Sequence, residues 1–184
     1  MVYYYFDSES RDASKQKLRG LLSSLLVQLA SESDPCYEIL SRLYETHAYR
    51  AQEPSNVELM NCLKNMLQVG QHPSRQATYI IIDAIDECPN TSGIQTPRKK
   101  VLEFLKVLIN WRLPHLRICV ASRPEVDIRN TLEPLKPLQV SLHEESGQRK
   151  DILDYITEVV KQMKWREEDK SLAIRILPEK SDGM

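Results

Sequence analysis

Three carboxylates follow an unbroken apolar run near the middle of the 184-residue chain. The run covers residues 79–82, and Asp83, Asp86 and Glu87 come at its end or just beyond it. A run of this kind predicts a strand that is buried on both faces, as in a parallel sheet covered by helices. Because such sheets place their chemistry at the carboxyl ends of the strands, we expect the three acids at that edge.

Carboxylates in this position suit a divalent cation beside a nucleotide phosphate. Asp83 can bind Mg²⁺ directly or through water, and Asp86 or Glu87 can polarise an attacking water. The alternative is an aspartate that caps the next helix, followed by two solvated acids. The Asp-x-x-Asp-Glu pattern directly after an apolar strand favours the metal site.

Arg123 follows directly on a second predicted strand, residues 116–121, which closes on Ser122-Arg123-Pro124. If that strand is a parallel neighbour of the first, Arg123 lies at the same edge of the sheet as Asp83. A guanidinium there can contact a γ-phosphate and respond to its presence. The alternative is a surface turn in which Arg123 pairs with Glu125 or Asp127, and the sequence leaves both open.

Other candidate chemistry finds little support in the sequence. His143 begins a segment like a zinc-protease helix, but the second histidine is absent, and Ser122 has no Gly-x-Ser-x-Gly setting. The basic run at residues 98–100 is expected to be the solvated start of a helix. The four cysteines fit neither a zinc pattern nor a disulfide framework, and Cys119 is expected in the core.

Composition is that of an ordinary globular domain, with 41% hydrophobic and 28% charged residues. A formal net charge of -1 gives no electrostatic case for nucleic acid or an anionic membrane as a partner. No apolar run approaches the roughly 18 residues that cross a bilayer. The first residues lack the basic segment of a signal peptide, so we predict a cytoplasmic location.

The segments between these motifs alternate between strand-like and helix-like patterns, which predicts an α/β fold with a parallel sheet flanked by helices. We expect an α/β core over residues 1–145 and the start of a helical region over residues 146–184. A further strand over residues 138–142 is possible. The predicted strands cover residues 2–6, 79–83 and 116–121, and apolar stripes predict helices around residues 18–29, 37–44, 59–67, 101–109, 152–163 and 172–177. Ser55 to Glu58 has the spacing of a capping box at the start of the third of these helices.

Residues 79–89 resemble the Walker B segment of NACHT-type STAND nucleoside triphosphatases, which are P-loop NTPases, and residues 116–125 resemble their sensor 1 strand. The resemblance covers nearly the whole chain. It is closest to large fungal NACHT proteins, whose N-terminal region is also called nephrocystin-3-like. Other stretches that carry it are Tyr-Tyr-Tyr-Phe-Asp at residues 3–7, Leu-Arg-Gly-Leu-Leu at 18–22, Val-Asp-Ile-Arg at 126–129, Ser-Leu-His-Glu-Glu-Ser-Gly at 141–147 and the last five residues.

The resemblance implies a role for each candidate residue. Asp83 matches the Mg²⁺-coordinating Walker B acid, Asp86 and Glu87 match the acidic pair that positions water, and Arg123 matches sensor 1. The implied cofactor is Mg²⁺ with ATP or GTP. The implied partners are nucleotide and either other protein domains or further copies of the chain.

The sequence contains no Gly-x-x-x-x-Gly-Lys-Ser/Thr. By the resemblance, this phosphate loop would precede Val2 together with a central strand, and a winged-helix region would follow Met184. Because the loop supplies most phosphate contacts, we expect no nucleotide hydrolysis by this chain alone. We also expect the missing strand to leave ladder groups in the sheet unpaired.

Three hypotheses about function follow. The first is a fragment of a NACHT signalling NTPase that works as a nucleotide-dependent switch. The second is a non-catalytic interaction module that uses the amphipathic helices at residues 18–29 and 147–163. The third is an unrelated α/β hydrolase with a metal at the Asp83 cluster.

Overall fold

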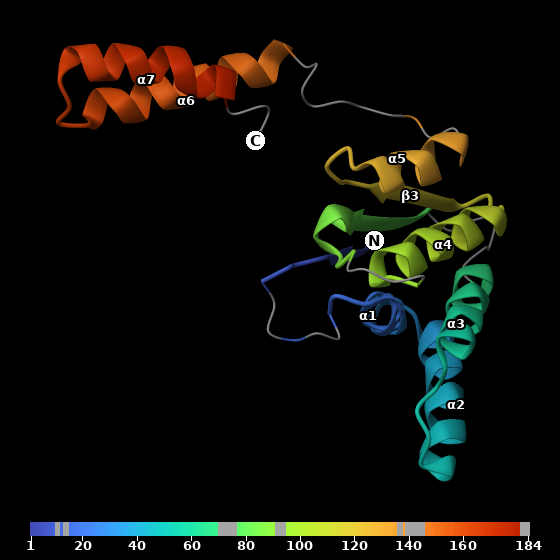
Figure 1. The fold of residues 1–184 in the computed structure, drawn as a ribbon. Helices are drawn as coiled ribbons and strands as arrows, with labels where there is room; N and C mark the ends of the chain where they lie inside the picture. The colour runs from blue at the N-terminus through green and yellow to red at the C-terminus, as the bar shows by residue number, and fades with distance from the viewer. Residues whose placement is uncertain are drawn as a thin grey trace. The chain divides into compact units, whose positions relative to one another are not determined.

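A computed structural model describes residues 1–9, 12, 15–69, 77–90, 95–135, 138 and 146–180. The chain divides into two compact units, Met1–Lys136 and Pro137–Met184 (Figure 1). The predicted functional division into residues 1–145 and 146–184 stays a prediction. The predicted strand over residues 138–142 falls outside the described residues, apart from Leu138, which belongs to no strand.

The first unit is built on a sheet of three parallel strands in the order β1-β2-β3. These are β1 (Val2–Tyr5), β2 (Thr78–Asp83) and β3 (Leu116–Val120). With helices beside the sheet and after it, the predicted α/β class is confirmed. β2 pairs with β1 on one side and with β3 on the other, and among the described residues β3 pairs with β2 alone. By the resemblance, the missing strand would lie beside residues 116–121, so the expected unpaired ladder concerns the other edge of β3 and stays a prediction.

The helices between β1 and β2 supply half of the buried residues in the described core. They are α1 (Leu18–Glu32), α2 (Asp34–Arg50) and α3 (Asn56–Val69). The leucine stripe of α1 is buried, with Leu21, Leu22 and Leu25 each 0% exposed, and it packs in one cluster with apolar side chains of β1, β2 and α3. One face of this helix is therefore buried in the core of the unit, while its other face carries exposed side chains such as Val27 (Figure 1).

The predicted capping box at the start of α3 is confirmed. The Ser55 N–H donates to Glu58 Oε2 (2.8 Å), and the Glu58 N–H donates to the Ser55 hydroxyl (3.3 Å). These bonds satisfy backbone donors that the first helical turn leaves unpaired. The Ser55 N–H and hydroxyl also lower the pKa of Glu58.

The elements after β2 complete this unit. The 3-10 turn η1 (Ile85–Glu87) leads into α4 (Pro97–Asn110), and α5 (Val126–Leu132) with the short η2 (Glu133–Leu135) follows β3. Thr96 caps α4 by accepting the Lys99 N–H at 3.1 Å. Apolar side chains of α4, among them Val101 and Leu105 at 0% exposure, join the same core as the strands.

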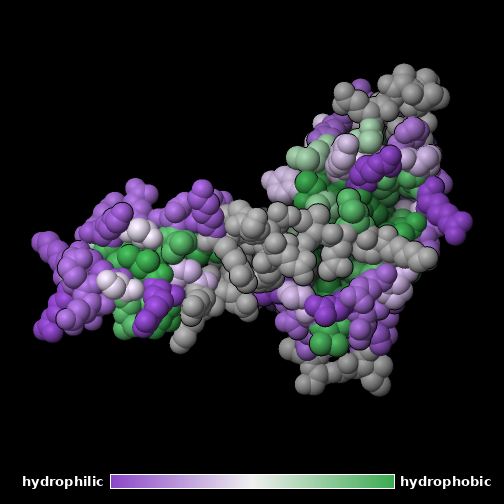
Figure 2. Space-filling model, turned by 90° about the horizontal axis from the view of Figure 1, so that it is seen from above, coloured by the Kyte–Doolittle hydropathy of each residue, from purple (hydrophilic) through white to green (hydrophobic). Residues whose placement is uncertain are grey.

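The second unit is a helical hairpin of α6 (Ser146–Gln162) and α7 (Glu167–Lys180), which pack against each other. Its apolar side chains are only partly covered, as with Leu153 and Met163 at 41% exposure each, and hydrophobic surface is visible on it in Figure 2. Within the described residues, no helix combines the length and the apolarity needed to cross a membrane.

The expectation that β2 is buried on both faces is wrong. Ile80 and Ile82 are 0% exposed, whereas Tyr79, which precedes Ile80 in the strand, is 51% exposed. Successive strand side chains point to opposite faces, and the core lies on the face of the sheet that carries Ile80 and Ile82. Cys119 pairs in register with Ile81 and points to the other face, so the expectation of a buried Cys119 is also wrong.

The outer edge of β1 is closed by one side chain of α1. Gln28 accepts the Tyr3 N–H at Oε1 (3.0 Å) and donates from Nε2 to the Tyr3 carbonyl (2.8 Å). Its amide thus takes the place that a peptide group of a further strand would occupy. Edge strands with unpaired backbone groups recruit other chains, so this contact protects the edge.

We predict that Gln28→Ala increases self-association, because the Tyr3 backbone groups become available for pairing with a second chain. Unfolding by urea should show a loss of about 1 kcal/mol in stability. Sedimentation velocity over a concentration series measures the association. Gln28→Glu is the matched control: its charge at the edge disfavours pairing, and equal association of the two variants would contradict the prediction.

The thiols differ sharply in accessibility. Cys36, Cys62 and Cys88 are buried, whereas Cys119 is exposed. Burial raises the pKa of Cys62 to about 11 and that of Cys88 to about 12. With pKa values this high, the two thiols stay protonated near neutral pH. Because the thiolate is the nucleophile, we expect both to be unreactive there.

We predict that a maleimide at pH 7.5 modifies the native chain at one thiol, Cys119, and reaches the others only after denaturation. Mass spectrometry of the labelled and digested chain identifies the site. Cys119→Ser should abolish the rapid phase of labelling. Rapid labelling of Cys88 in the native chain would contradict the prediction.

Candidate functional site

The acidic segment begins with a sharp change of backbone direction at the end of β2. Ala84 adopts a left-handed conformation (φ 53°, ψ 46°), after which Ile85 is 0% exposed in the core. The Ala84 N–H donates to Asp83 Oδ1 (2.8 Å), and the Asp83 side chain is exposed. The carboxylate of Asp83 is therefore presented at the carboxyl edge of the sheet, as predicted.

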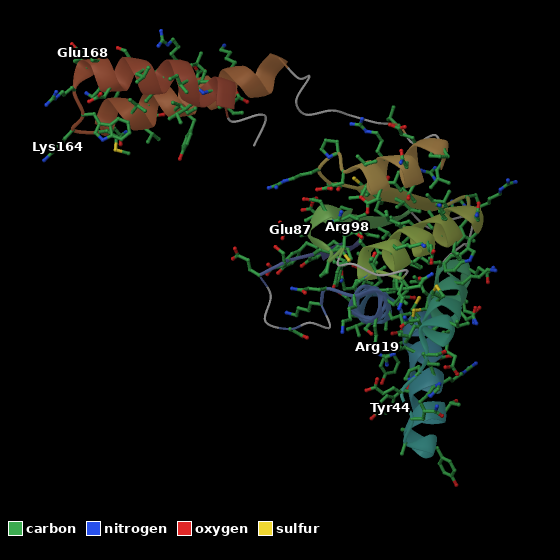
Figure 3. The ribbon with its side chains drawn as sticks, in the orientation of Figure 1. Arg19, Tyr44, Glu87, Arg98, Lys164 and Glu168 are labelled. Atoms are coloured by element: carbon green, nitrogen blue, oxygen red, sulfur yellow. The ribbon has the colours of Figure 1, made fainter. Side chains whose placement is uncertain are left out.

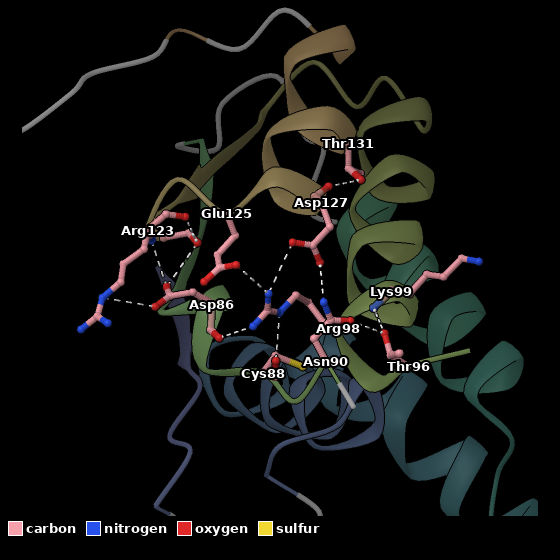
Figure 4. Close-up of polar contacts among 11 residues, drawn as sticks. Asp86, Cys88, Asn90, Thr96, Arg98, Lys99, Arg123, Glu125, Asp127 and Thr131 are labelled. Atoms are coloured by element: carbon pink, nitrogen blue, oxygen red, sulfur yellow. Dashed lines mark hydrogen bonds and ion pairs between the residues drawn. The ribbon is translucent and has the colours of Figure 1, made fainter. Parts of the chain in front are cut away.

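Asp86 connects the segment after β2 to the turn after β3 (Figure 4). Its Oδ1 accepts the Arg123 N–H (3.0 Å) and the Ser122 hydroxyl (3.2 Å), and its Oδ2 lies 3.6 Å from Arg123 Nε. The side chain of Asp86 is only 10% exposed, whereas both donors belong to exposed residues. The structure thus brings two predicted site residues, Asp86 and Arg123, into contact.

The guanidinium of Arg123 lies at the surface, with its side chain 70% exposed. Arg123 forms an ion pair with Asp86. The acids named in the alternative, Glu125 and Asp127, lie 3.8 and 3.4 Å from Nη1 of Arg98. Asp86 therefore holds Arg123 through both its backbone N–H and its Nε.

Glu87 points to a different neighbour from Asp86. Its Oε2 accepts the N–H (3.0 Å) and the hydroxyl (3.3 Å) of Ser8, which follows β1. The acidic segment is thus held to the turns after both neighbouring strands. Among the described residues, no three His, Cys, Asp or Glu side chains lie close enough together to hold a metal ion.

Arg98 is a site residue that the sequence did not reveal. It was expected to be solvated at the start of a helix, but it is 7% exposed, and its Nε donates to the Cys88 carbonyl at 3.0 Å. Its position explains the error, because residue 98 lies three and four positions before Val101 and Leu102 on the apolar stripe of α4. That spacing was the signal in the sequence.

The chemistry open to this edge follows from what each group already binds. Mg²⁺ is usually held by one or two carboxylates with substrate phosphates and water completing its shell, so the exposed Asp83 fits a phosphate-bound Mg²⁺. The exposed guanidinium of Arg123 suits a phosphate oxygen. Asp86 and Glu87 are engaged by protein donors, and their predicted role in positioning water stays a prediction.

A family model described as nephrocystin 3, N-terminal, matches residues 1–123. The chain belongs to this family. The matched residues of the nephrocystin 3 N-terminal region run from β1 to Arg123, so they contain all three acids, Arg98 and the turn after β3. Neither a curated protein nor a solved structure matches the chain.

We predict that Asp86→Ala lowers the free energy of unfolding by about 2 kcal/mol, because it removes the charged acceptor of the Arg123 and Ser122 donors. Urea unfolding followed by circular dichroism measures the change. Asp83→Ala, which removes an exposed carboxylate three residues away, should change stability by less than about 0.5 kcal/mol. Equal losses in the two variants would mean that Asp86 does not anchor the turn.

Proposed function

We propose that this chain supplies the acidic part of a nucleotide site in a NACHT-like signalling NTPase. The observation that carries the proposal is the parallel pairing of β2 with β3, which puts Asp83, Asp86 and Arg123 at one edge of the sheet. Open α/β sheets bind ligands at this edge. Membership of the nephrocystin 3 N-terminal family agrees with the proposal at a coarser level.

In this proposal each polar group has a distinct role. Asp83 would coordinate Mg²⁺, which would neutralise phosphate charge when bound with ATP or GTP. Arg123 would contact the γ-phosphate, with Asp86 holding its backbone in place. Glu87 would orient water only after leaving Ser8, because its carboxylate is bound there. Partners would be nucleotide and, in the cytoplasm, other protein domains or further copies of the chain.

We predict weak nucleotide binding that requires Mg²⁺ and falls at least tenfold in Asp83→Ala, because the metal then loses its protein ligand. Fluorescence anisotropy with labelled ATP and GTP analogues, with Mg²⁺ or with EDTA, measures it. Asp154→Ala, which changes an exposed acid of α6, is the matched control. Equal affinity in all three proteins, or no binding at all, would count against the proposal.

The same samples test for hydrolysis. The sequence contains no Gly-x-x-x-x-Gly-Lys-Ser/Thr to grip phosphate, so phosphate release should equal the background rate. Turnover that Asp83→Ala abolishes would overturn the proposal that this chain is inactive alone. Arg123→Ala should weaken triphosphate binding more than diphosphate binding if its guanidinium contacts the γ-phosphate.

The second candidate function is a protein-interaction module. Three tyrosines on the uncovered face of the sheet favour it, since Tyr3, Tyr5 and Tyr79 are 57%, 61% and 51% exposed. The helix at residues 18–29 cannot serve as the partner surface through its leucine stripe, because those leucines are buried in the core. The partly exposed apolar residues of α6 and α7 remain available for this role.

One further measurement, metal binding without nucleotide, distinguishes the three hypotheses about function. Titration with Mg²⁺ or Mn²⁺ in the absence of nucleotide should give little binding under the leading proposal, since a single exposed carboxylate is a weak site for these ions. Tight metal binding without nucleotide would favour the hydrolase hypothesis. An interaction module would show neither metal nor nucleotide binding.

A further inference from the structure

Arg98 is a charged side chain at a buried position. Its side chain is 8% exposed, although it sits in the first turn of a helix whose neighbouring lysines, Lys99 and Lys100, are exposed. Burying a charge is costly unless it is paired and hydrogen-bonded. The contacts that meet this cost therefore indicate what the residue holds in place. Figure 3 labels Arg98 on α4 and Glu87 near it.

One side of the Arg98 guanidinium binds the acidic segment after β2. Nε donates to the Cys88 carbonyl (3.0 Å), and Nη2 donates to the Asp86 carbonyl. Both acceptors are backbone groups on either side of Glu87. A planar, rigid fork that binds two carbonyls fixes the orientation of the peptide units between them.

The other side of the guanidinium faces the segment after β3. Nη1 lies 3.4 Å from Asp127 Oδ1 and 3.8 Å from Glu125 Oε2. Asp127 is held in turn by Asn90, which donates to its Oδ2 at 3.2 Å. One arginine of α4 therefore joins the segments that leave two neighbouring strands (Figure 4).

Asp86 is consequently held through both its backbone and its side chain. Its carbonyl accepts from Arg98, and its carboxylate accepts from the backbone of Arg123. We infer that Arg98 is the positioning residue of this edge: it fixes the acidic segment and, through Asp86, sets the position of Arg123. The inference deepens the proposed function and rests on it for the role of Arg123 toward phosphate.

Hydrogen exchange of the full chain tests the inference without any ligand. In Arg98→Met, the amides of Arg123 and Cys88 should exchange at least tenfold faster than in the wild type, while those in the centre of α1 stay unchanged. Arg98→Lys should also lose protection, because a compact ammonium cannot replace the fork across two carbonyls and two carboxylates. Lys100→Met, on the same helical turn, is the matched control and should match the wild type.

Several results of the Arg98 variants would overturn the inference. They are unchanged exchange at Arg123 and Cys88 in Arg98→Met, full protection in Arg98→Lys, and equal acceleration in α1, which would indicate only a loss of global stability. Asp127→Asn tests the same network at a side chain that is 38% exposed, with little disturbance of the core. Exchange of the Arg123 amide should be faster in Asp127→Asn than in the wild type, by a smaller factor than in Arg98→Met. Unchanged exchange would also count against the inference.

Nucleotide binding separates this inference from the proposed function. If Arg98→Met changes exchange as expected but the wild type binds no Mg²⁺–nucleotide, the proposed function fails and the positioning role stands. If the wild type binds nucleotide and Arg98→Met binds it equally well, the positioning role fails and the proposed function stands. We expect at least a fivefold loss of affinity for a triphosphate analogue in Arg98→Met.

Discussion

The backbone ladder between β2 and β3 determines where every polar group of the candidate site lies. Past the last paired residues, the Ala121 N–H donates to the Ile82 carbonyl (2.9 Å) and the Ile85 N–H donates to the Ala121 carbonyl (3.4 Å). The segments that follow β2 and β3 therefore leave the sheet side by side and in the same direction. Only with this register do Asp86 and the Arg123 backbone meet at hydrogen-bond distance.

The positions of the strands and most helices were predictable because their apolar periodicity is strong. The leucine stripe of α1 and the capping box of α3 both appear as the sequence indicates. The burial of the sheet was not predictable, because β-branched and aromatic residues suit a pleated surface on either face. Tyr79 and Cys119 are apolar enough to belong to a covered face, yet both lie on the uncovered one.

The composition of the candidate site was predictable, but the direction of its side chains was not. Asp86 and Glu87 are adjacent in the sequence, yet one binds the turn after β3 and the other binds Ser8 after β1. Those choices depend on the left-handed turn at Ala84 and on which strands flank β2. Arg98 was missed for a related reason: a basic run suggests solvent unless its place on the apolar stripe is also considered.

The parallel topology also has a consequence for how the chain folds. Val2 pairs with Ile80, and Ile80 pairs with Ile118, so each ladder joins residues that are far apart in the sequence. Contacts of this kind form slowly because the chain must first close long loops. The helices α1 to α3 rely on nearer contacts and can assemble earlier, which leaves the edge that carries Asp83, Asp86 and Arg123 among the last parts of the unit to form.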